Sequence, residues 1–241
     1  MKTSPLPLLI LLVGLLAGAS HALTTGNRSF TCPIDGNQWK QEVEMSGTSF
    51  GRRLDLRPIG PTGSPWTAPQ CPKCRFVLFE DQTDKATVGK LKPYILSEAY
   101  QTASKDQPSY FCIALIQTFL KTKPQVIGHA HLKASWQTEA NPKECRRHLE
   151  SALAQFTDAL TTLKPGEKDF QTTAFLCCEL ERRTGRFDEA RKRAEALLKT
   201  DSFKDDHPRG LLERELEFIG KKDLAPHAMT DELEKFLTGE K

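Results

Sequence analysis

Apolar and polar positions follow a helical periodicity along most of the chain from about residue 85 onward. In residues 142–163, Leu149, Leu153, Phe156 and Leu160 recur at intervals of three and four, which places them on one face of a helix. Similar patterns predict helices near residues 88–103, 109–122, 124–140, 142–163, 168–184, 187–200, 209–220 and 230–237. Because short links join these segments, we expect neighbouring helices to pack as antiparallel hairpins.

Prolines and a capping residue mark where several of these helices begin. Proline fits the first turn of a helix, since its fixed φ is helical and its missing N–H would be unpaired there. Prolines stand just before or at the start of four predicted helices, at Pro108, Pro124, Pro142 and Pro165. Thr230, followed by two acidic residues, predicts a capped start for the last helix.

One predicted helix pair is typical of a tetratricopeptide unit. Gly185 stands at the turn between the two helices, Phe187 follows it, and Ala190 is the small residue expected where the helices cross. Only this unit carries the pattern, whereas about three are needed for an independent solenoid. The surrounding helices are therefore expected to close the core as a bundle.

The chain before about residue 84 has a different composition. Residues 23–82 are rich in Gly, Pro, Ser and Thr, and their apolar runs are short. Residues 45–65 resemble loops and a hairpin, and Arg75–Phe79 predicts a strand because it is apolar and partly β-branched. We therefore predict an α+β fold that is mainly α, with a small β module at residues 23–84 and an all-α tetratricopeptide-like domain at residues 85–241.

The first 22 residues have the pattern of a secretory signal peptide. Lys2 gives a positive start, Leu6–Ala17 is apolar, and Ser20 and Ala22 place small residues at the −3 and −1 positions of a cleavage site. The apolar stretch is shorter than the roughly 20 residues that a membrane span needs. We expect cleavage after Ala22, a secreted or periplasmic location, and no membrane association after the signal is removed.

Overall composition excludes several classes of protein. The chain has 34 basic and 31 acidic residues, a net charge of +3, which lacks the strong basic excess of a dedicated nucleic-acid binder. With 38% hydrophobic residues it does not fit the profile of a disordered chain. Seven cysteines among 241 residues are too few for a disulfide-stapled mini-protein. We expect no nucleic-acid partner.

The cysteines of the first part provide the main candidate chemistry. Cys71-Pro72-Lys73-Cys74 is a C-x-x-C motif, and Cys32-Pro33-Ile34-Asp35 has the same form with aspartate in place of the second cysteine. Such a tight turn can point two side chains at one ion, and zinc prefers four ligands in a tetrahedron. The spacing therefore predicts a zinc-ribbon-like site with Cys32, Asp35, Cys71 and Cys74 as ligands.

Two other interpretations of these cysteines remain open. An exported protein meets an oxidising environment, which favours a structural disulfide from Cys32 to Cys71 or Cys74. Alternatively, Cys71 and Cys74 form a thiol–disulfide redox pair. A redox C-x-x-C usually opens a helix after a strand, whereas here an apolar, strand-like segment follows the motif. The local pattern thus favours a metal knuckle.

The two motifs, with Arg-Arg-Leu-Asp-Leu-Arg at residues 52–57 between them, resemble a bacterial family, domain-of-unknown-function family 2225. The resemblance covers about residues 30–200, and residues 174–190 are similar to the tetratricopeptide-like hairpin of that family. Members typically carry two complete Cys-Pro-x-Cys knuckles, which implies a bound zinc with Cys32, Cys71 and Cys74 at ligand positions. Asp35 at the fourth position departs from the family pattern.

Other polar and cysteine positions have simpler interpretations. Arg52, Arg53 and Arg57 form a candidate anion patch, although a solvated hairpin face with Asp55 among the arginines is the favoured alternative. Residues 181–193 mix charges at helical spacing, as an ordinary solvent-exposed face does. Among the cysteines, Cys112 and at least one of Cys177 and Cys178 are expected in the core, and Cys145 is expected to be partly exposed.

These observations favour an exported, non-catalytic interaction or scaffold protein with a structural zinc site. Its helical region would bind a protein partner. The sequence contains no Gly-x-Ser-x-Gly, phosphate-loop or His-Glu-x-x-His motif. The alternative function is a thiol–disulfide oxidoreductase that uses Cys71 and Cys74, and an enzyme with dispersed site residues is a third.

Overall fold

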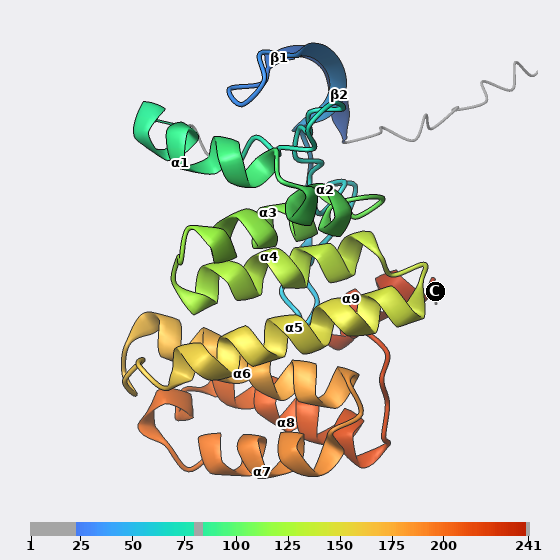
Figure 1. The fold of residues 1–241 in the computed structure, drawn as a ribbon. Coiled ribbons are helices and arrows are strands. Elements are labelled where there is room, and N and C mark those ends of the chain that lie inside the picture. Colours follow the sequence, from blue (N-terminus) through green and yellow to red (C-terminus); the bar gives the residue numbers. More distant parts are fainter. Residues whose placement is uncertain (1–22, 80–83, 240–241) are drawn as a thin grey trace, which may run out of the picture.

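The computed structural model describes residues 23–79 and 84–239. The predicted signal peptide lies outside these residues. The fold is mainly helical with a small β part, as the sequence pattern predicts (Figure 1). Within the described residues, no helix has both the length and the apolar character needed to cross a bilayer.

Nine α-helices and one 3-10 helix are present in the described residues. Their bounds are α1 (Lys85–Ile95), α2 (Glu98–Ala103), α3 (Ser109–Phe119), α4 (Pro124–Gln137), α5 (Pro142–Leu160), α6 (Lys168–Arg183), α7 (Phe187–Leu197), η1 (Asp201–Phe203), α8 (Asp206–Gly220) and α9 (Asp231–Thr238). Most boundaries fall within a few residues of the predicted ones. Local signals explain this agreement: Pro124 and Pro142 occupy the first turns of α4 and α5, and Asn141 and Thr230 cap α5 and α9.

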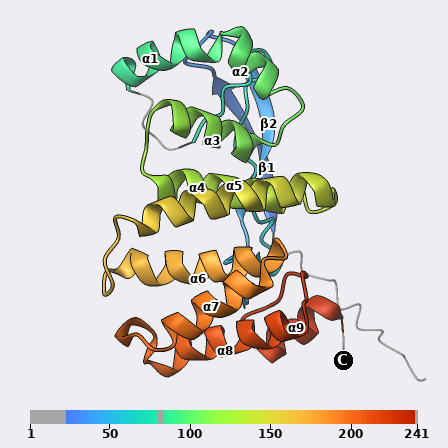
Figure 2. The ribbon, with the colours of Figure 1, turned by 60° about the horizontal axis from the view of Figure 1, so that its bottom comes forward.

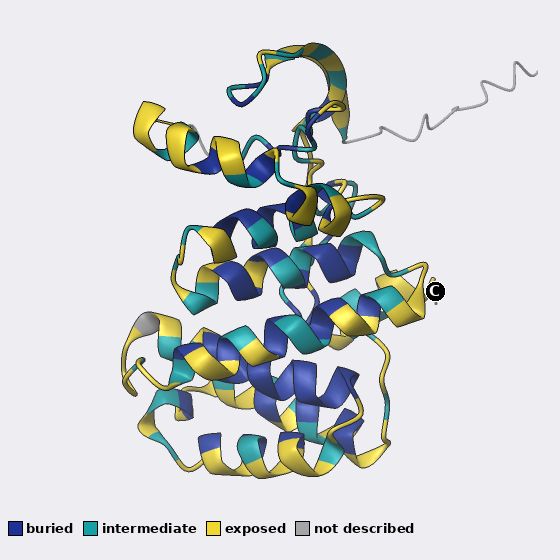
Figure 3. Cartoon of the chain, in the orientation of Figure 1, coloured by how far each residue is buried: buried dark blue, intermediate teal, exposed yellow. Residues whose placement is uncertain are grey.

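Consecutive helices from α3 to α8 pack against one another in a stack (Figures 1 and 2). The helix α5 contributes Leu149, Leu153 and Phe156 to a core that it shares with Leu176 and Leu180 of α6. Buried positions therefore gather on the faces where helices meet, and exposed positions cover the outer turns of α7 (Figure 3). The apolar helix face predicted for residues 142–163 therefore packs into the core, as its spacing indicates.

The predicted tetratricopeptide-like pair corresponds to α6 and α7. Gly185 lies in the turn with a left-handed φ of 80°, a conformation that suits glycine. Ala190 is fully buried, and the Cys178 thiol lies 3.4 Å from its carbonyl oxygen. A small residue at position 190 thus lets α7 approach α6 closely.

Two predicted elements differ from the structure. The single helix expected at residues 88–103 is two helices, because Ser97 adopts an extended conformation and its hydroxyl accepts the Tyr100 N–H at the start of α2. The predicted strand at Arg75–Phe79 is wrong: Val77 forms an isolated bridge with Gln70. Phe76 and Val77 are fully buried against helices instead of in a sheet, and Leu78 and Phe79 are partly buried.

The β part consists of two antiparallel pairs. Strands β1 (Thr24–Thr31) and β2 (Gln38–Ser46) form the first, and β3 (Gly51–Arg52) and β4 (Pro58–Ile59) form a very short second hairpin. Leu54, between β3 and β4, is fully buried in a core formed mainly by α6, α7 and α8. The cyan segment that carries it passes behind α4 and α5 in Figure 1. The second hairpin is therefore embedded in the helical stack.

All seven cysteines, each within the described residues, are buried free thiols. Cys112 is a core residue as predicted, and both Cys177 and Cys178 are buried, where the sequence predicts at least one of them to be. The expectation that Cys145 is partly exposed is wrong, because its side chain packs with Leu149 between α4, α5 and α6 and is only 7% exposed. Cys32, Cys71 and Cys74 belong to a separate core, which they share with residues of α1 and α2.

Candidate metal centre

The structure brings together the four residues that the sequence predicts as ligands. One ligand atom from each of Cys32, Asp35, Cys71 and Cys74 lies within 4.8 Å of every other. The Sγ atoms of Cys32 and Cys74 are 3.5 Å apart, and the Cys71 Sγ is 3.8 Å from both carboxylate oxygens of Asp35. The three cysteines are buried, and Asp35 is half-buried. These four residues can hold a metal ion.

The two motifs fold into nearly identical turns. In the first, the Cys32 N–H donates to the Asn37 carbonyl and the Gly36 N–H donates to the Cys32 carbonyl, at 2.8 and 2.9 Å. In the second, the Cys71 N–H donates to the Phe76 carbonyl and the Arg75 N–H to the Cys71 carbonyl, at the same two distances.

The backbone conformation repeats as well. Gly36 and Arg75 occupy the same position in the two turns, and both have positive φ, 72° and 60°. Asp35 therefore stands in the place that Cys74 occupies in the second turn. The structure supports the alignment of the two motifs that the sequence suggested.

Backbone N–H groups point at the ligand atoms. The Asn37 N–H donates to the Asp35 carboxylate at 3.0 Å, and the Phe76 N–H has the corresponding place beside the Cys74 thiol. The Cys32 thiol faces the N–H groups of Ile34 and Asp35. Such donors stabilise thiolate and carboxylate ligands, which is the state that binds a cation.

The acid–base properties of the site fit a metal that must displace protons. Burial raises the pKa of Cys32 to about 11, against the opposing effect of nearby N–H groups. Burial, together with the neighbouring Cys32 and Cys71, also raises the pKa of Cys74. For Asp35, burial acts to raise the pKa, but the Asn37 N–H and the thiols outweigh it and hold the pKa below its usual range. Without a cation, the raised pKa values keep the Cys32 and Cys74 thiols neutral at pH 7.

The donor set fits zinc. With Zn–S distances of about 2.3 Å, a tetrahedron places two sulfur ligands about 3.8 Å apart, close to the 3.5 Å between the Sγ atoms of Cys32 and Cys74. Three thiolates with one carboxylate suit a borderline-soft ion, whereas calcium and magnesium prefer oxygen ligands. Cys32, Asp35, Cys71 and Cys74 are therefore the residues that would hold the ion.

Helix α2 fixes the second turn in place. The Gln101 side-chain amide donates to the Cys74 carbonyl at 2.8 Å, and the Arg75 guanidinium donates to the Ser104 hydroxyl at 3.0 Å. The Tyr100 hydroxyl donates to the Arg75 carbonyl at 2.9 Å. This anchoring holds Arg75 in a left-handed conformation that non-glycine residues seldom adopt.

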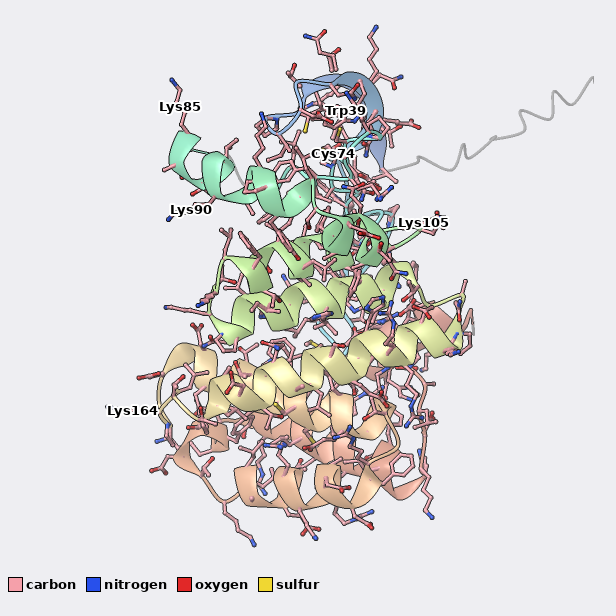
Figure 4. The ribbon with its side chains drawn as sticks, in the orientation of Figure 1. Trp39, Cys74, Lys85, Lys90, Lys105 and Lys164 are labelled. Atoms are coloured by element: carbon pink, nitrogen blue, oxygen red, sulfur yellow. The ribbon has the colours of Figure 1, made fainter. Side chains whose placement is uncertain are left out.

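An apolar shell surrounds the cluster. It includes Ile34 and Phe76 from the two turns and Leu91 and Ile95 from α1. Figure 4 shows Cys74 between the first hairpin, where Trp39 is labelled, and the helices α1 and α2. The site thus joins the β part to the first helices.

Sequence reasoning did not identify the residues that support the ligands. Asn37 contributes both its backbone N–H to Asp35 and its side-chain amide toward the Cys71 sulfur, at 3.8 Å. An aspartate side chain commonly accepts the backbone N–H two residues further on, so Asp35 itself is a weak signal that could have suggested the first contact. Nothing in the sequence pairs Gln101 with Cys74, because that contact depends on how α2 packs.

The geometry argues against a redox role for Cys71 and Cys74. Reactive thiols are usually accessible and have lowered pKa values, commonly at a helix N-terminus. Here the two cysteines lie in a turn and are 0% and 3% exposed. The pKa of Cys74 is raised by burial.

The arginines of the second hairpin do not form an open anion patch. Arg53 pairs with the fully buried Asp55 and with Glu139, and Arg57 pairs with Glu139. The alternative of a solvated hairpin face is also wrong for Arg53 and Asp55, which are 6% and 0% exposed. Arg52 alone is exposed. These ion pairs connect the hairpin to the helical stack.

The solvent-exposed face predicted for residues 181–193 is partly wrong. Glu181, Arg182 and Arg183 are buried. Arg182 donates to Glu179 at 2.6 Å and to Glu215 of α8 at 2.9 Å, with all three side chains fully buried. Because helical spacing does not reveal a partner on another helix, mixed charges alone could not show this burial.

The fold and site define a protein in which two turns, whose side chains can hold a metal ion, sit on a stack of helices. A family described as an uncharacterized protein conserved in bacteria (DUF2225) matches residues 66–217, more than half of the chain. The chain belongs to this family. Cys71 and Cys74 lie within the matched region, and Cys32 and Asp35 precede it. No curated protein and no solved structure matched the chain.

Proposed function

We propose that this protein is an exported, non-catalytic interaction protein whose β part is stabilised by a structural zinc ion. The observation that carries the proposal is the repeated turn geometry, which brings Cys32, Asp35, Cys71 and Cys74 together. A structural zinc site has four protein ligands, whereas a catalytic one keeps a position open for water or substrate. Four converging ligands, three of them buried, match the structural type.

Zinc would contribute folding free energy to the part of the chain with the smallest core. Strands β1 and β2 bury few residues of their own; within them, only Val43 is buried. Structural zinc contributes about 10–16 kcal/mol of apparent binding free energy in small zinc-binding peptides. The ion would therefore hold β1, β2 and the two turns against α1 and α2.

Apolar surface on the early helices supports a protein partner for the helical region. Phe119 of α3 is 42% exposed and stacks on Tyr94 of α1, with ring centroids 4.1 Å apart. Leu96, just after α1, is 50% exposed. Clustered exposed apolar side chains commonly mark interaction surfaces. Export rests on the signal-peptide pattern of residues 1–22.

Native mass spectrometry combined with elemental analysis tests the proposal. We expect about one zinc per chain and free thiols at Cys32, Cys71 and Cys74, and in the native host a mature chain that starts at Leu23. Cys74→Ser should lose the zinc, because it removes one thiolate ligand. The matched control Cys145→Ser, at a buried cysteine outside the cluster, should retain it.

Other outcomes separate the alternatives. A chain that carries no metal but a disulfide between Cys32 and Cys74 would replace the zinc site with a structural cross-link. Catalytic turnover of a disulfide substrate that is lost in Cys71→Ser would support the oxidoreductase. Either result contradicts a structural zinc protein.

A further inference from the structure

A pocket of about 590 Å³ lies between α3, α4 and the extended segments 66–68 and 78–79. Every residue that lines it falls within the region matched to the family. Its volume is in the range of small-molecule sites, which are mostly apolar with a few polar groups. The pocket is separate from the metal centre: none of the four candidate ligands lines it.

Two helix faces, one on α3 and one on α4, line this pocket. Tyr110, Ile113 and Gln117 of α3 recur at intervals of three and four, and Val126, His129, Ala130 and Lys133 of α4 do the same. Residues at these intervals share one face of a helix. Two faces of packed helices, and not a mobile loop, therefore position the lining side chains.

Aromatic side chains contribute much of the apolar lining. They are Trp66, Phe79 and Tyr110. The Trp66 indole N–H donates to the Thr62 carbonyl at 2.7 Å, which fixes the ring although it is 44% exposed. Rigid aromatic walls bind flat apolar groups with little loss of side-chain entropy.

Lys133 is the one lining side chain that carries a full charge at neutral pH. Its ammonium group lies 5.1 Å from the centre of the Tyr110 ring. Burial alone lowers the pKa of Lys133, and no carboxylate of the described residues forms an ion pair with it. The nearby Glu44 accepts the N–H and hydroxyl of Thr67 instead, at 2.9 and 3.1 Å. The pocket therefore contains a partly desolvated cation without a counter-ion.

Two further polar side chains, Gln117 and His129, line the same pocket as Lys133. Gln117 is only 6% exposed, and its side-chain amide oxygen (Oε1) accepts no hydrogen bond from any described residue. Burial, followed by the charge of Lys133, lowers the pKa of His129, which keeps its ring neutral at pH 7. Buried amides normally have partners, so an unpartnered one beside a pocket indicates a missing ligand or water.

We propose that this pocket binds a small organic anion with a flat apolar body and a carboxylate. The apolar body contacts Trp66, Phe79 and Tyr110, and the carboxylate pairs with Lys133. The pairing supplies the counter-ion that the chain does not, and Gln117 offers a hydrogen-bonding group in the same pocket. The proposal is independent of the zinc site.

Binding of naphthalene-2-carboxylate, measured by calorimetry with the full chain, tests this inference. The neutral naphthalene-2-carboxamide has nearly the same shape, and we expect it to bind about tenfold more weakly because it lacks the charge-assisted bond. Lys133→Met should weaken carboxylate binding about tenfold and leave amide binding unchanged. Lys143→Met, at an exposed lysine outside the pocket, should change neither.

A second variant separates pocket binding from surface binding. Ala68→Trp fills the pocket from an extended segment and should abolish binding of both probes. Equal affinities for carboxylate and amide, unchanged carboxylate binding in Lys133→Met, or no binding of either probe at millimolar concentration would overturn the proposal. If Lys133→Met does not fold, the Ala68→Trp variant is a sufficient test by itself, because retained binding of the probes in that variant would overturn the proposal.

Discussion

At position 35, a carboxylate stands where the matching turn has a thiol. Both the Asn37 N–H and the left-handed Gly36 belong to the turn itself, so they would remain after a change of the ligand atom. Asp35→Cys completes a four-thiolate site, which zinc prefers. We expect zinc affinity to rise about tenfold, measured by competition with a chromogenic chelator.

The control is Asp35→Asn, which keeps the size and the hydrogen-bond acceptor of the side chain but removes its charge. This variant should bind zinc more weakly than the wild type. If neither substitution changes the affinity, Asp35 serves only to stabilise the turn through Asn37.

A second prediction at the scale of single residues concerns Arg182, which forms buried ion pairs with Glu179 and Glu215. Burial, together with the neighbouring Glu179, raises the pKa of Glu215 well above its usual range. Arg182→Met leaves this acidic pair without a cation, and we expect a loss of about 3–5 kcal/mol of unfolding free energy in urea. Arg209→Met, which removes an exposed pair with Glu213, should cost about 0.5 kcal/mol or less. Similar losses in both variants would contradict the burial argument.

At the scale of the elements, the crossing of α4 and α5 depends on a missing side chain. A Cβ added at Gly128 would lie 2.8 Å from the ring of Phe156, which is fully buried and cannot move aside. Gly128→Ala should therefore lower the unfolding free energy by about 1–3 kcal/mol. Gly89→Ala, on an exposed position of α1 with nothing within 4 Å, should raise it by about 0.5–1 kcal/mol. Thermal unfolding of these two variants distinguishes the effect of packing from that of helix propensity. A Gly128→Ala variant that is more stable than the wild type would contradict the tight crossing of α4 and α5.

Elements were predictable where their signals are local. Proline and capping residues gave the starts of α4, α5 and α9, and the repeated Cys-Pro motif gave all four candidate ligands. Partners distant in the sequence were not predictable. Ser97 interrupts a helix-like pattern, Phe76 and Val77 pack on helices instead of forming a strand, and Arg182 finds Glu215 only when α8 packs on α6.

For the whole molecule, metal removal should act unevenly. The cluster shares its apolar shell with α1 and α2, whereas the cores around α6 and α8 lie elsewhere. Chelation with a strong zinc chelator should therefore increase amide hydrogen exchange in residues 85–103 and leave α6 and α8 protected. Cys74→Ser without chelator should give the same pattern. Uniform loss of protection would mean that the chain unfolds as one unit without metal.

Acid should destabilise the stack through two histidines. Burial and the nearby Arg147 lower the pKa of both His131 and His148 to about 4. Their unfolded pKa is about 6.5, so the unfolded chain binds more protons between these values and stability falls as pH drops from about 6.5 to about 4. Urea midpoints across this range should fall less steeply in a His131→Gln, His148→Gln double variant. Equal slopes would contradict this assignment.

The embedded hairpin has a consequence for how the chain is made. Leu54 and Asp55 leave the ribosome early, but Leu54 donates its N–H to His227, and Asp55 pairs with Arg183 at a separation of 128 residues. Such distant contacts slow folding because a long loop must close first. A nascent chain therefore exposes an apolar leucine, and an aspartate that lacks its distant partner Arg183, until α6 and the segment after α8 have been synthesised. During that interval residues 51–59 are the natural target for a chaperone, and a chain stalled before residue 183 would present them continuously.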